Sequence, residues 1–259
     1  MDFYDTLAPY YHLIFADWEA SMRRQGEALD RLIRAHCRRP ARTVFDAACG
    51  IGTQALPLAA RGYAVTGSDL APASMERAKR EAAARGLTVD FRVGDMREPP
   101  GSQFDAVIAC DNAMPHLLTD ADLLQAFEAF YHALLPGGLC LVSVRDYEAV
   151  ERGGVQVHPY AARTENGTRY VLMQVWEWRD GSNATASDTA PNMVYDTTMY
   201  VIEHPDGAPP AVHASRTAYY AVSVGTLMQL MERAGFGGVQ RADDVFYQPV
   251  LIGHRPPDT

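Results

Sequence analysis

Apolar residues recur with two alternating periods along the first 146 residues, and this alternation predicts the fold. Short apolar runs of the length of buried strands lie at 42–48, 63–69, 88–95, 104–111 and 139–146. Between them, the spacing of apolar residues predicts helices over 18–38, 53–62, 70–86 and 120–138, the last ending at a Pro-Gly-Gly stretch. Strands that alternate with helices in this way predict an α/β protein with a doubly wound, mostly parallel sheet.

The pattern changes after residue 147, where β-branched and aromatic residues alternate with polar ones. These runs predict antiparallel strands at 169–178, 193–204 and 212–222, joined by polar turns at 179–192 and 205–211. An amphipathic helix over 224–236 and a closing pair of strands within 238–256 follow. We therefore expect a helical cap segment (1–40), a ligand-binding core (41–146), an antiparallel β insertion that covers the site (147–222), and a helix with strands that complete the core (223–259).

Composition and charge narrow the function to the handling of a small molecule. Of the 259 residues, 47% are hydrophobic and 21% are charged, and the formal net charge is −9. An acidic protein is a poor partner for nucleic acid or an anionic membrane, because both need clustered cations. No apolar stretch approaches the roughly 20 residues of a membrane span.

Two further features predict a cytoplasmic location. The start of the chain, MDFYDTLAPYYH, is acidic and aromatic and does not resemble a signal peptide. The four cysteines, Cys37, Cys49, Cys110 and Cys140, form no C-x-x-C pair, so we expect free thiols in a reducing compartment.

The segment FDAACGIGTQ joins the first predicted strand to a helix, and two kinds of ligand fit its glycines. Gly50, Gly52 and Ala55 match the G-x-G-x-x-G/A pattern of dinucleotide-binding dehydrogenases, with Asp69 near the spacing of a ribose-binding acid. However, Asp46 ends the strand four residues before Gly50, where it would repel a pyrophosphate and attract a positively charged ligand. The sequence therefore favours a cationic small molecule over a dinucleotide.

Features at the other strand ends connect this turn to a family. Asp95 follows the third predicted strand, and Pro-Gly-Gly directly precedes the fifth. Together with the turn, they resemble the class I S-adenosylmethionine-dependent methyltransferases, whose D-x-G-x-G-x-G motif is matched by DAACGIG with Ala48 in place of the first glycine. An alanine is tolerated wherever φ is negative. The resemblance implies a Rossmann-like fold and S-adenosylmethionine (SAM) as the cofactor, with S-adenosylhomocysteine (SAH) as its product.

The resemblance also implies roles around the cofactor. Gly50 and Gly52 would meet its methionine portion, Asp69 would bond the ribose hydroxyls, and Asp95 with Met96 would hold the adenine. The full set of expected cofactor-binding residues is Asp46, Ala48, Gly50, Gly52, Asp69, Leu70, Asp95, Met96, Cys110, Tyr10 and Arg24. No metal is expected, because no cluster of histidines and cysteines has ligand spacing.

Longer stretches resemble a narrower family, the glycine N-methyltransferases and glycine/sarcosine N-methyltransferases. They include CGIGTQ, DNAMPHL, LLPGGLCLVSVRDYE and AYYAVSVGTLMQLMERAGF, and the likeness is weakest across 150–170 and 180–197. In that family an asparagine and an arginine hold the substrate amino acid, and by motif position these match Asn112 and Arg145. A tyrosine packs beside the sulfonium, for which Tyr10 and Tyr11 are the candidates.

The expected site residues follow from these matches. Catalytic roles are expected for His116, Tyr11 and Asn112, and acceptor contacts for Asn112, His116, Arg145, Tyr147, Trp176, Tyr219 and Tyr220. The guanidinium of Arg145 offers a planar fork of donors for a carboxylate. His116 is either a general base or an orienting residue. Trp176 and Trp178 share one face of a strand, where they either pack the insertion onto the core or line the acceptor pocket.

The acceptor itself stays open between two classes. The overall likeness favours the nitrogen of an amino acid or amine of the glycine or sarcosine type. The segments at 150–164 and 179–192 depart from the family, which favours instead C- or O-methylation of an indole-containing or diketopiperazine-like metabolite. A SAM-binding module without catalytic activity is a third hypothesis. The sequence carries no separate assembly motif, so the oligomeric state is not predicted.

Overall fold

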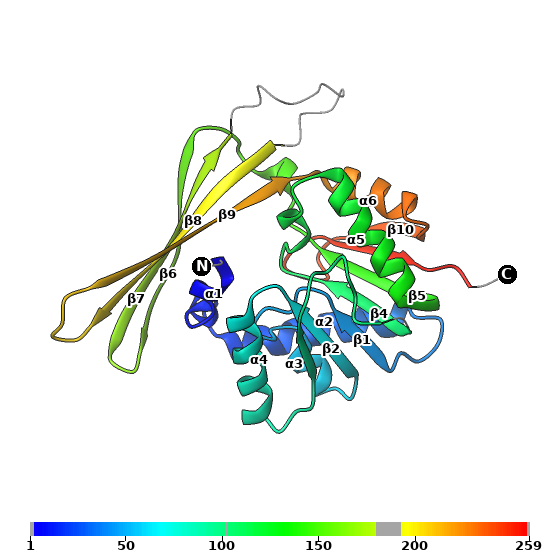
Figure 1. Cartoon of the computed structure of the whole chain (residues 1–259), viewed down its shortest axis with the longest axis horizontal. Helices are drawn as coiled ribbons and strands as arrows, with labels where there is room; N and C mark the ends of the chain where they lie inside the picture. Colours follow the sequence, from blue (N-terminus) through cyan, green and yellow to red (C-terminus); the bar gives the residue numbers. More distant parts are fainter. Residues whose placement is uncertain (1–2, 102, 180–192, 258–259) are drawn as a thin grey trace.

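The computed structural model describes residues 3–101, 103–179 and 193–257. These residues form a large sheet with helices on both faces and a smaller sheet that extends away from it (Figure 1). Most of the predicted turn at 179–192 lies outside the described residues.

The large sheet has seven strands in the order β10-β11-β5-β4-β1-β2-β3. They are β1 (Thr43–Asp46), β2 (Ala64–Asp69), β3 (Asp90–Val93), β4 (Phe104–Ala109), β5 (Leu134–Ser143), β10 (Gly237–Ala242) and β11 (Val250–His254). The first five are parallel, whereas β11 is antiparallel to β5 and β10 is antiparallel to β11. The predicted fold class is confirmed. The strand order reverses between β1 and β4, where sheets of this type bind ligands at the carboxyl ends of their strands.

One predicted boundary is wrong. The sequence predicts a helix up to the Pro-Gly-Gly stretch, but α5 (Asp120–Ala133) ends before it and β5 runs through it. The pairing of β5 with β4 shifts register in this region, so the additional residues leave the ladder as a bulge. Gly137 adopts a φ of +78° in the bulge, a conformation without steric cost for glycine.

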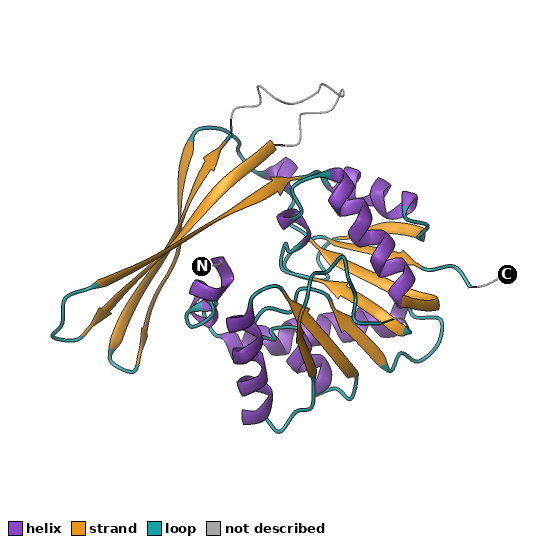
Figure 2. Ribbon diagram, in the orientation of Figure 1, coloured by secondary structure: helices purple, strands orange, loops and turns teal. Residues whose placement is uncertain are grey.

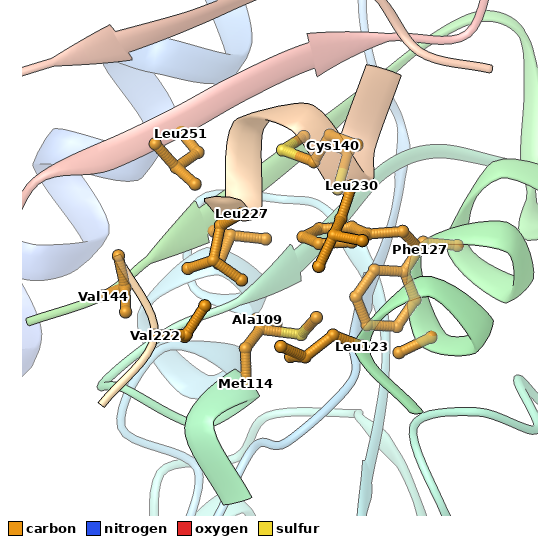
Figure 3. Close-up of a cluster of buried hydrophobic side chains, with 14 of the residues drawn as sticks. Ala109, Met114, Leu123, Phe127, Cys140, Val144, Val222, Leu227, Leu230 and Leu251 are labelled. Atoms are coloured by element: carbon orange, nitrogen blue, oxygen red, sulfur yellow. The ribbon is translucent and has the colours of Figure 1, made fainter. Parts of the chain in front are cut away.

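Helices cover both faces of the large sheet. Successive residues of a strand point to opposite faces, so the apolar strands carry side chains on both faces that helices bury. Besides α5, the helices beside this sheet are α2 (Trp18–His36), the short α3 (Ala55–Ala59), α4 (Pro72–Ala84) and α6 (Val224–Arg233). Val44 of β1 belongs to the cluster that contains α2, α3 and α4, whereas its neighbour Phe45 belongs to the cluster with α5 and α6. In Figure 3, Leu123 and Phe127 from α5 lie near Leu227 and Leu230 from α6 within the second cluster.

The helix α2 follows the sequence prediction closely. Its side chains Leu29, Leu32 and Ile33 are buried on one face against the large sheet. Asp17 begins the helix by accepting a hydrogen bond from the backbone N–H of Ala20 at 2.8 Å. Such an N-cap satisfies a backbone donor that the first turn leaves without a partner.

The smaller sheet is antiparallel, with strands in the order β6-β7-β8-β9. They are β6 (Val155–Glu165), β7 (Thr168–Trp178), β8 (Met193–Pro205) and β9 (Ala211–Ala221). The sequence predicts the last three of these strands but not β6. Pro159 obscures β6 in the sequence, and the structure tolerates this proline because β6 is an edge strand whose pairing is irregular between Pro159 and Ala161.

Aromatic side chains join the smaller sheet to the core. Trp176 and Trp178 are buried on the same face of β7, and each ring lies 4.8 Å from the ring of Tyr195 on β8. All three belong to the cluster that contains α5 and α6. Of the two roles expected for the tryptophans, the structure therefore shows packing of the insertion onto the core.

The N-terminal segment lies between the two sheets (Figure 2). It consists of α1 (Phe3–Leu7) and the 3-10 turn η1 (Tyr11–Ile14). Its apolar side chains pack against Leu172, Met199 and Val201 of the smaller sheet. On the other side, Asp5 accepts a hydrogen bond from the first turn of α4, at the backbone N–H of Ala73. The segment thereby covers the carboxyl ends of the parallel strands.

Candidate active site

Two cavities meet at the carboxyl ends of the strands. The strand-end cavity, of about 310 Å³, lies against the turn after β1 and the ends of β2, β3 and β4. Among its lining residues are seven of the residues expected to bind the cofactor, namely Ala48, Gly50, Asp69, Leu70, Asp95, Met96 and Cys110. His116, expected to be catalytic, also lines it.

The inter-sheet cavity, of about 260 Å³, lies between the N-terminal segment, the strand ends and the smaller sheet. Its polar and aromatic lining residues are Tyr4, Tyr11, Phe15, Asp111, Asn112, Arg145, Gln174, Tyr160, Tyr219, Tyr247, Gln248 and Phe3. Three residues, Tyr4, Tyr11 and Asp111, line both cavities. The two cavities are therefore neighbours with a shared wall.

The glycine turn after β1 shapes the strand-end cavity. Gly50 and Gly52 adopt φ angles of +52° and +94°, which glycine reaches without steric cost. A Cβ at Gly52 would come within 2.9 Å of Leu56, whereas a Cβ at Gly50 would meet no atom within 4 Å. The absence of a side chain at Gly52 thus allows Leu56 to pack closely beneath the turn. At Gly50 it leaves the backbone accessible from the cavity.

Asp69 links the glycine turn to the end of β2. Its Oδ2 accepts from the backbone N–H of Gly50 and its Oδ1 from that of Ala71, both at 3.0 Å. Next to it, Leu70 is 60% exposed and lines the cavity with an apolar surface. A fixed carboxylate beside an apolar side chain suits a ligand with hydroxyl groups and a flat ring.

Asp95, at the end of β3, is held by a neighbouring arginine. Arg97 donates to its carboxylate with a closest distance of 2.7 Å, and a second nitrogen of Arg97 reaches Asp122 at the same distance. This ion pair lowers the pKa of Asp95 below its ordinary value. The carboxylate is therefore ionised at neutral pH and faces the cavity as an acceptor.

Asp46 lies behind the glycine turn and does not line either cavity. It is fully buried, and neither of its carboxylate oxygens has a hydrogen-bond partner in the described part of the chain. Burial raises the pKa of Asp46 to about 8, despite the lowering influence of the Ala48 backbone amide. An orphaned carboxyl group next to the turn fits a site that receives a positively charged ligand.

Arg145 supplies the positive charge of the inter-sheet cavity. Its guanidinium lies 4.7 Å from the ring centre of Trp176 and donates to the hydroxyl of Tyr195 at 3.1 Å. Within residues 3–101, 103–179 and 193–257, no carboxylate forms an ion pair with it. Trp176 thus supports Arg145 from behind and does not line the cavity.

Asn112 fixes the loop that precedes the 3-10 turn η2 (Met114–His116). Its Nδ2 donates to the hydroxyl of Tyr147 at 2.8 Å, and its Oδ1 accepts from the backbone N–H of Arg145 at 3.0 Å. Asn112 therefore positions Arg145. Tyr147 is fully buried and supports this arrangement without lining the cavity.

His116 belongs to a chain of hydrogen bonds that joins the two cavities. The Tyr4 hydroxyl lies 2.7 Å from Nε2 of His116 and 3.1 Å from the Tyr219 hydroxyl. The rings of His116 and Tyr219 pack with their centres 4.1 Å apart. Burial lowers the pKa of His116 to about 4, so this imidazole is neutral at pH 7 and can act as an acceptor.

Several expected site residues lie elsewhere. Arg24 is exposed on α2 and lines a surface hollow that shares Phe15 and Tyr247 with the inter-sheet cavity but no residue with the strand-end cavity. The Tyr10 hydroxyl contacts Glu203 and His213 of the smaller sheet, so that of the two tyrosines expected beside the sulfonium only Tyr11 lines the cavities. The Tyr220 hydroxyl donates to Asp120 at the start of α5.

Further lining residues of the inter-sheet cavity come from five separate segments. The sequence indicates Tyr4 as a possible lining residue and Asp111 as a structural acceptor rather than a base. Tyr160, Gln174 and Gln248 are not predicted from the sequence.

The described residues hold neither a metal site nor a membrane-spanning helix. In the part of the chain that the structure describes, no group of three or more His, Cys, Asp or Glu residues has a geometry that suits a metal ion. No helix among the same residues is long and apolar enough to cross a membrane. The four cysteines are free thiols.

Comparison with known proteins defines the class. Residues 44–138 match a family described as a methyltransferase domain, and this range contains β1 to β4 and the glycine turn. This match shows a methyltransferase domain over these residues, and the strand order of the large sheet is that of the class I SAM-dependent methyltransferases. The match favours SAM over a dinucleotide as the ligand of the glycine turn.

Individual relatives refine this assignment. The glycine/sarcosine N-methyltransferase of Parasynechococcus marenigrum is 31% identical over 144 residues, which cover 54% of this chain and 50% of the relative. The glycine N-methyltransferase of Oryctolagus cuniculus is 26% identical over 246 residues, 84% of this chain and 77% of the relative. The structure of Streptomyces venezuelae DesVI superposes with a TM-score of 0.75 over 100% of this chain and 99% of that one, at 18% identity.

The extent of these matches limits what they establish. The chain spans about half the length of the first curated relatives that it matches. The likeness to DesVI concerns the fold, because the identity is low. The fold does not define the acceptor, which depends on the residues that line the cavities.

Proposed function

We propose that the protein transfers the methyl group of SAM to the nitrogen of a small amino acid of the glycine or sarcosine type. In this proposal the strand-end cavity holds the cofactor, and the inter-sheet cavity holds the acceptor. The observation that carries the acceptor assignment is Arg145, a cation that lines the inter-sheet cavity without a carboxylate partner among the described residues.

The residues of the strand-end cavity suit SAM, which supplies a methyl group on a positively charged sulfur. Asp69 bonds the ribose hydroxyls, and the carboxylate of Asp95 accepts from the adenine amino group beside Leu70 and Met96. The backbone around Gly50 approaches the methionine portion. The orphaned, buried Asp46 supports a cationic ligand, because a positive charge beside it would favour the ionised form that burial now disfavours.

The inter-sheet cavity suits a small carboxylate. Its volume of about 260 Å³ lies just below the usual range for ligand pockets, which favours a small acceptor. Arg145 can bind a carboxylate with two parallel hydrogen bonds, which fixes both the position and the orientation of the substrate. Holding the acceptor beside the cofactor in this way supplies much of the rate of a displacement reaction.

A second acceptor class is supported by the aromatic lining of the same cavity. Phe15, Tyr160, Tyr219 and Tyr247 offer flat surfaces on which an indole or a diketopiperazine can pack. In that case the substrate would be methylated on carbon or oxygen. The neutral His116, bonded to Tyr4, would then accept the proton that such a substrate releases.

Release of SAH from SAM by the purified protein separates the two classes. The acceptors compared are glycine, sarcosine, dimethylglycine, indole and a diketopiperazine. Turnover of glycine or sarcosine, with loss of that turnover in Arg145→Gln, is the expected result. Turnover restricted to the aromatic acceptors contradicts the proposal and favours the second class. SAH binding without turnover of any acceptor favours a binding module.

A further inference from the structure

Asp111 lies where the two cavities meet, and the proposed function so far gives it no role. It is one of the three residues that line both cavities, and it is the only acidic one. It follows β4 directly, and both Asp111 and Asn112 adopt left-handed backbone conformations, with φ angles of +60° and +66°. Such conformations are uncommon outside glycine and are maintained only where the surroundings enforce them.

The surroundings of Asp111 hold its backbone and one of its oxygens. Its backbone N–H donates to the hydroxyl of Ser143 at 2.9 Å. Its Oδ2 accepts from Nε2 of Gln54 at 3.2 Å, and the same nitrogen donates to Oε1 of Gln25 on α2 at 2.7 Å. Gln25 and Gln54 are both buried. The motifs CGIGTQ and DNAMPHL, far apart in the sequence, therefore meet in a single hydrogen bond.

The second oxygen of Asp111 is left for a ligand. Within residues 3–101, 103–179 and 193–257, Gln54 is the only side-chain partner of this carboxylate. Asp111 raises the pKa of the hydroxyls of Tyr4 and Tyr11, of the carboxyl group of Asp46 and of the thiol of Cys110, and none of these groups carries a positive charge. Arg145, the cation that lines the same inter-sheet cavity, forms no ion pair with Asp111 among the described residues. The carboxylate of Asp111 can therefore bind a cationic group of a ligand.

We propose that Asp111 binds the ammonium group of the acceptor and removes one of its protons before methyl transfer. The proposal rests on the proposed function, and it defines the acceptor as a zwitterion: the carboxylate lies on Arg145 and the ammonium on Asp111. Primary and secondary α-amino acids satisfy both contacts. Quaternary amines have no proton to give, and indoles carry neither charge.

The step is balanced in protons and electrons. A proton passes from the acceptor nitrogen to Oδ1 of Asp111, which frees the nitrogen lone pair. The N–C bond then forms as the C–S bond breaks with its electron pair remaining on sulfur. The proton on Asp111 leaves to water when the methylated product departs. Burial raises the pKa of Asp111 to about 6, which leaves it ionised at pH 7 and better suited to accept a proton than an exposed aspartate.

Two neighbouring residues are less suited to this role. The amide of Asn112 is already bonded to Tyr147 and to the backbone of Arg145. Nε2 of His116 is bonded to the Tyr4 hydroxyl, so His116 reaches the inter-sheet cavity only through Tyr4. These two residues position the site, whereas Asp111 touches the reacting nitrogen.

The first test measures binding without turnover. SAH-loaded protein is titrated by calorimetry with glycine and with glycolate, which keeps the carboxylate but replaces the ammonium with a hydroxyl group. We expect the wild-type protein to bind glycine at least 10-fold more tightly than glycolate. Asp111→Asn, which keeps the side-chain shape, is expected to remove this preference. Gln54→Met, which frees Asp111 from its support, is expected to reduce it, and Asp206→Asn in an exposed turn is the matched control.

The outcomes separate the two proposals. Equal affinity of the wild-type protein for glycine and glycolate contradicts the role of Asp111 but leaves the carboxylate site at Arg145 intact. Failure of both ligands to bind overturns the proposed function and the role of Asp111 together. An unchanged preference in Asp111→Asn, with normal SAH binding as evidence of a folded protein, also overturns the role of Asp111.

The second test uses the pH profile of turnover with sarcosine. Loss of the proton acceptor typically lowers the rate by about 10²–10⁴-fold. In the wild-type protein, kcat/KM is expected to fall below about pH 6, where Asp111 becomes protonated. Asp111→Asn should lack this fall and stay slow at every pH. A wild-type decline that persists unchanged in Asp111→Asn contradicts the assignment.

Discussion

The strand-end cavity and the inter-sheet cavity share three residues but differ in how they are built and charged. The first is formed almost entirely by short loops that follow parallel strands, and its charged groups are mainly carboxylates. The second combines the N-terminal segment, two strand ends, the smaller sheet and a C-terminal loop, and its fixed cation is Arg145. One cavity suits a positively charged ligand and the other a negatively charged group.

The difference in construction has consequences for specificity. The strand-end cavity depends on the backbone of one continuous sheet, so its shape is tied to the stability of the core. The inter-sheet cavity depends on side chains from β6, β7, β8 and β9, which can be exchanged without altering that core. A new acceptor can thus be accommodated by changes in the smaller sheet while cofactor binding is retained.

The largest expected effect comes from removing the cation of the inter-sheet cavity. Truncating one partner of a buried charge pair typically costs about 2–5 kcal/mol. Arg145→Gln should therefore lower kcat/KM for glycine or sarcosine by about 100-fold or more and leave SAH affinity unchanged. Steady-state kinetics and SAH calorimetry measure the two quantities.

The matched control is Arg216→Gln. Arg216 forms an ion pair with Glu177 on the smaller sheet and its side chain is 58% exposed. This variant should behave like the wild-type protein. An equal loss of SAH affinity in Arg145→Gln would show that the two cavities are not separable.

The next largest effect should appear in the other cavity. A hydrogen bond to a charged group contributes about 1.5–3 kcal/mol. Asp69→Ala should therefore weaken SAH binding by about 10–100-fold, measured by calorimetry. Asp90→Ala, which removes an exposed ion pair with Arg92 on β3, is the control. Unchanged SAH affinity in Asp69→Ala would remove Asp69 from the proposed cofactor site.

The two cavities also differ in how much of them the sequence predicts. Gly50, Asp69 and Asp95 follow strands that are evident from apolar runs, and parallel strands bring their carboxyl ends to one edge. Assigning the strands is therefore enough to predict that these residues lie near the site. The family resemblance then adds Arg145 and Asn112, which also follow strands.

The rest of the inter-sheet cavity is not visible in a local pattern. Tyr4 reaches His116 across 112 residues of sequence, because α1 folds back between the two sheets. Tyr160 lies on β6, where Pro159 and the exposure of alternate residues conceal the strand. The sequence indicates Tyr4 only as a possible lining residue and does not single out Tyr160. Their contacts follow from the packing of the smaller sheet, which depends on residues distant in sequence.

A smaller effect should follow from breaking the link between the cavities. Tyr4→Phe removes the hydroxyl that joins His116 to Tyr219. The net contribution of a hydrogen bond is about 0.5–1.5 kcal/mol. We therefore expect kcat to fall by up to about 10-fold, with unchanged SAH affinity. Tyr10→Phe is the control in the same segment, because the Tyr10 hydroxyl contacts the smaller sheet instead. Equal losses in both variants would indicate a merely structural role for Tyr4.

The last expected effect concerns stability, not activity, and the buried Asp46 behind the strand-end cavity. Its pKa is raised from 3.8 to about 8, so between these values the folded protein holds a proton that the unfolded chain releases. Stability without cofactor should therefore fall as pH rises through this range, by at most about 1.4 kcal/mol per pH unit.

Other groups confine this measurement to part of the range. Asp111, with a pKa raised to about 6, acts in the same direction at lower pH, and His116, lowered from 6.5 to about 4, acts in the opposite direction below 6.5. Above that value Asp46 dominates. Asp46→Asn should therefore gain thermal stability relative to the wild-type protein as pH rises from 6.5 toward 8, by a few degrees in Tm. Parallel unfolding curves for the two proteins would mean that Asp46 is ionised in the folded state, and its charge would then already be compensated without the cofactor.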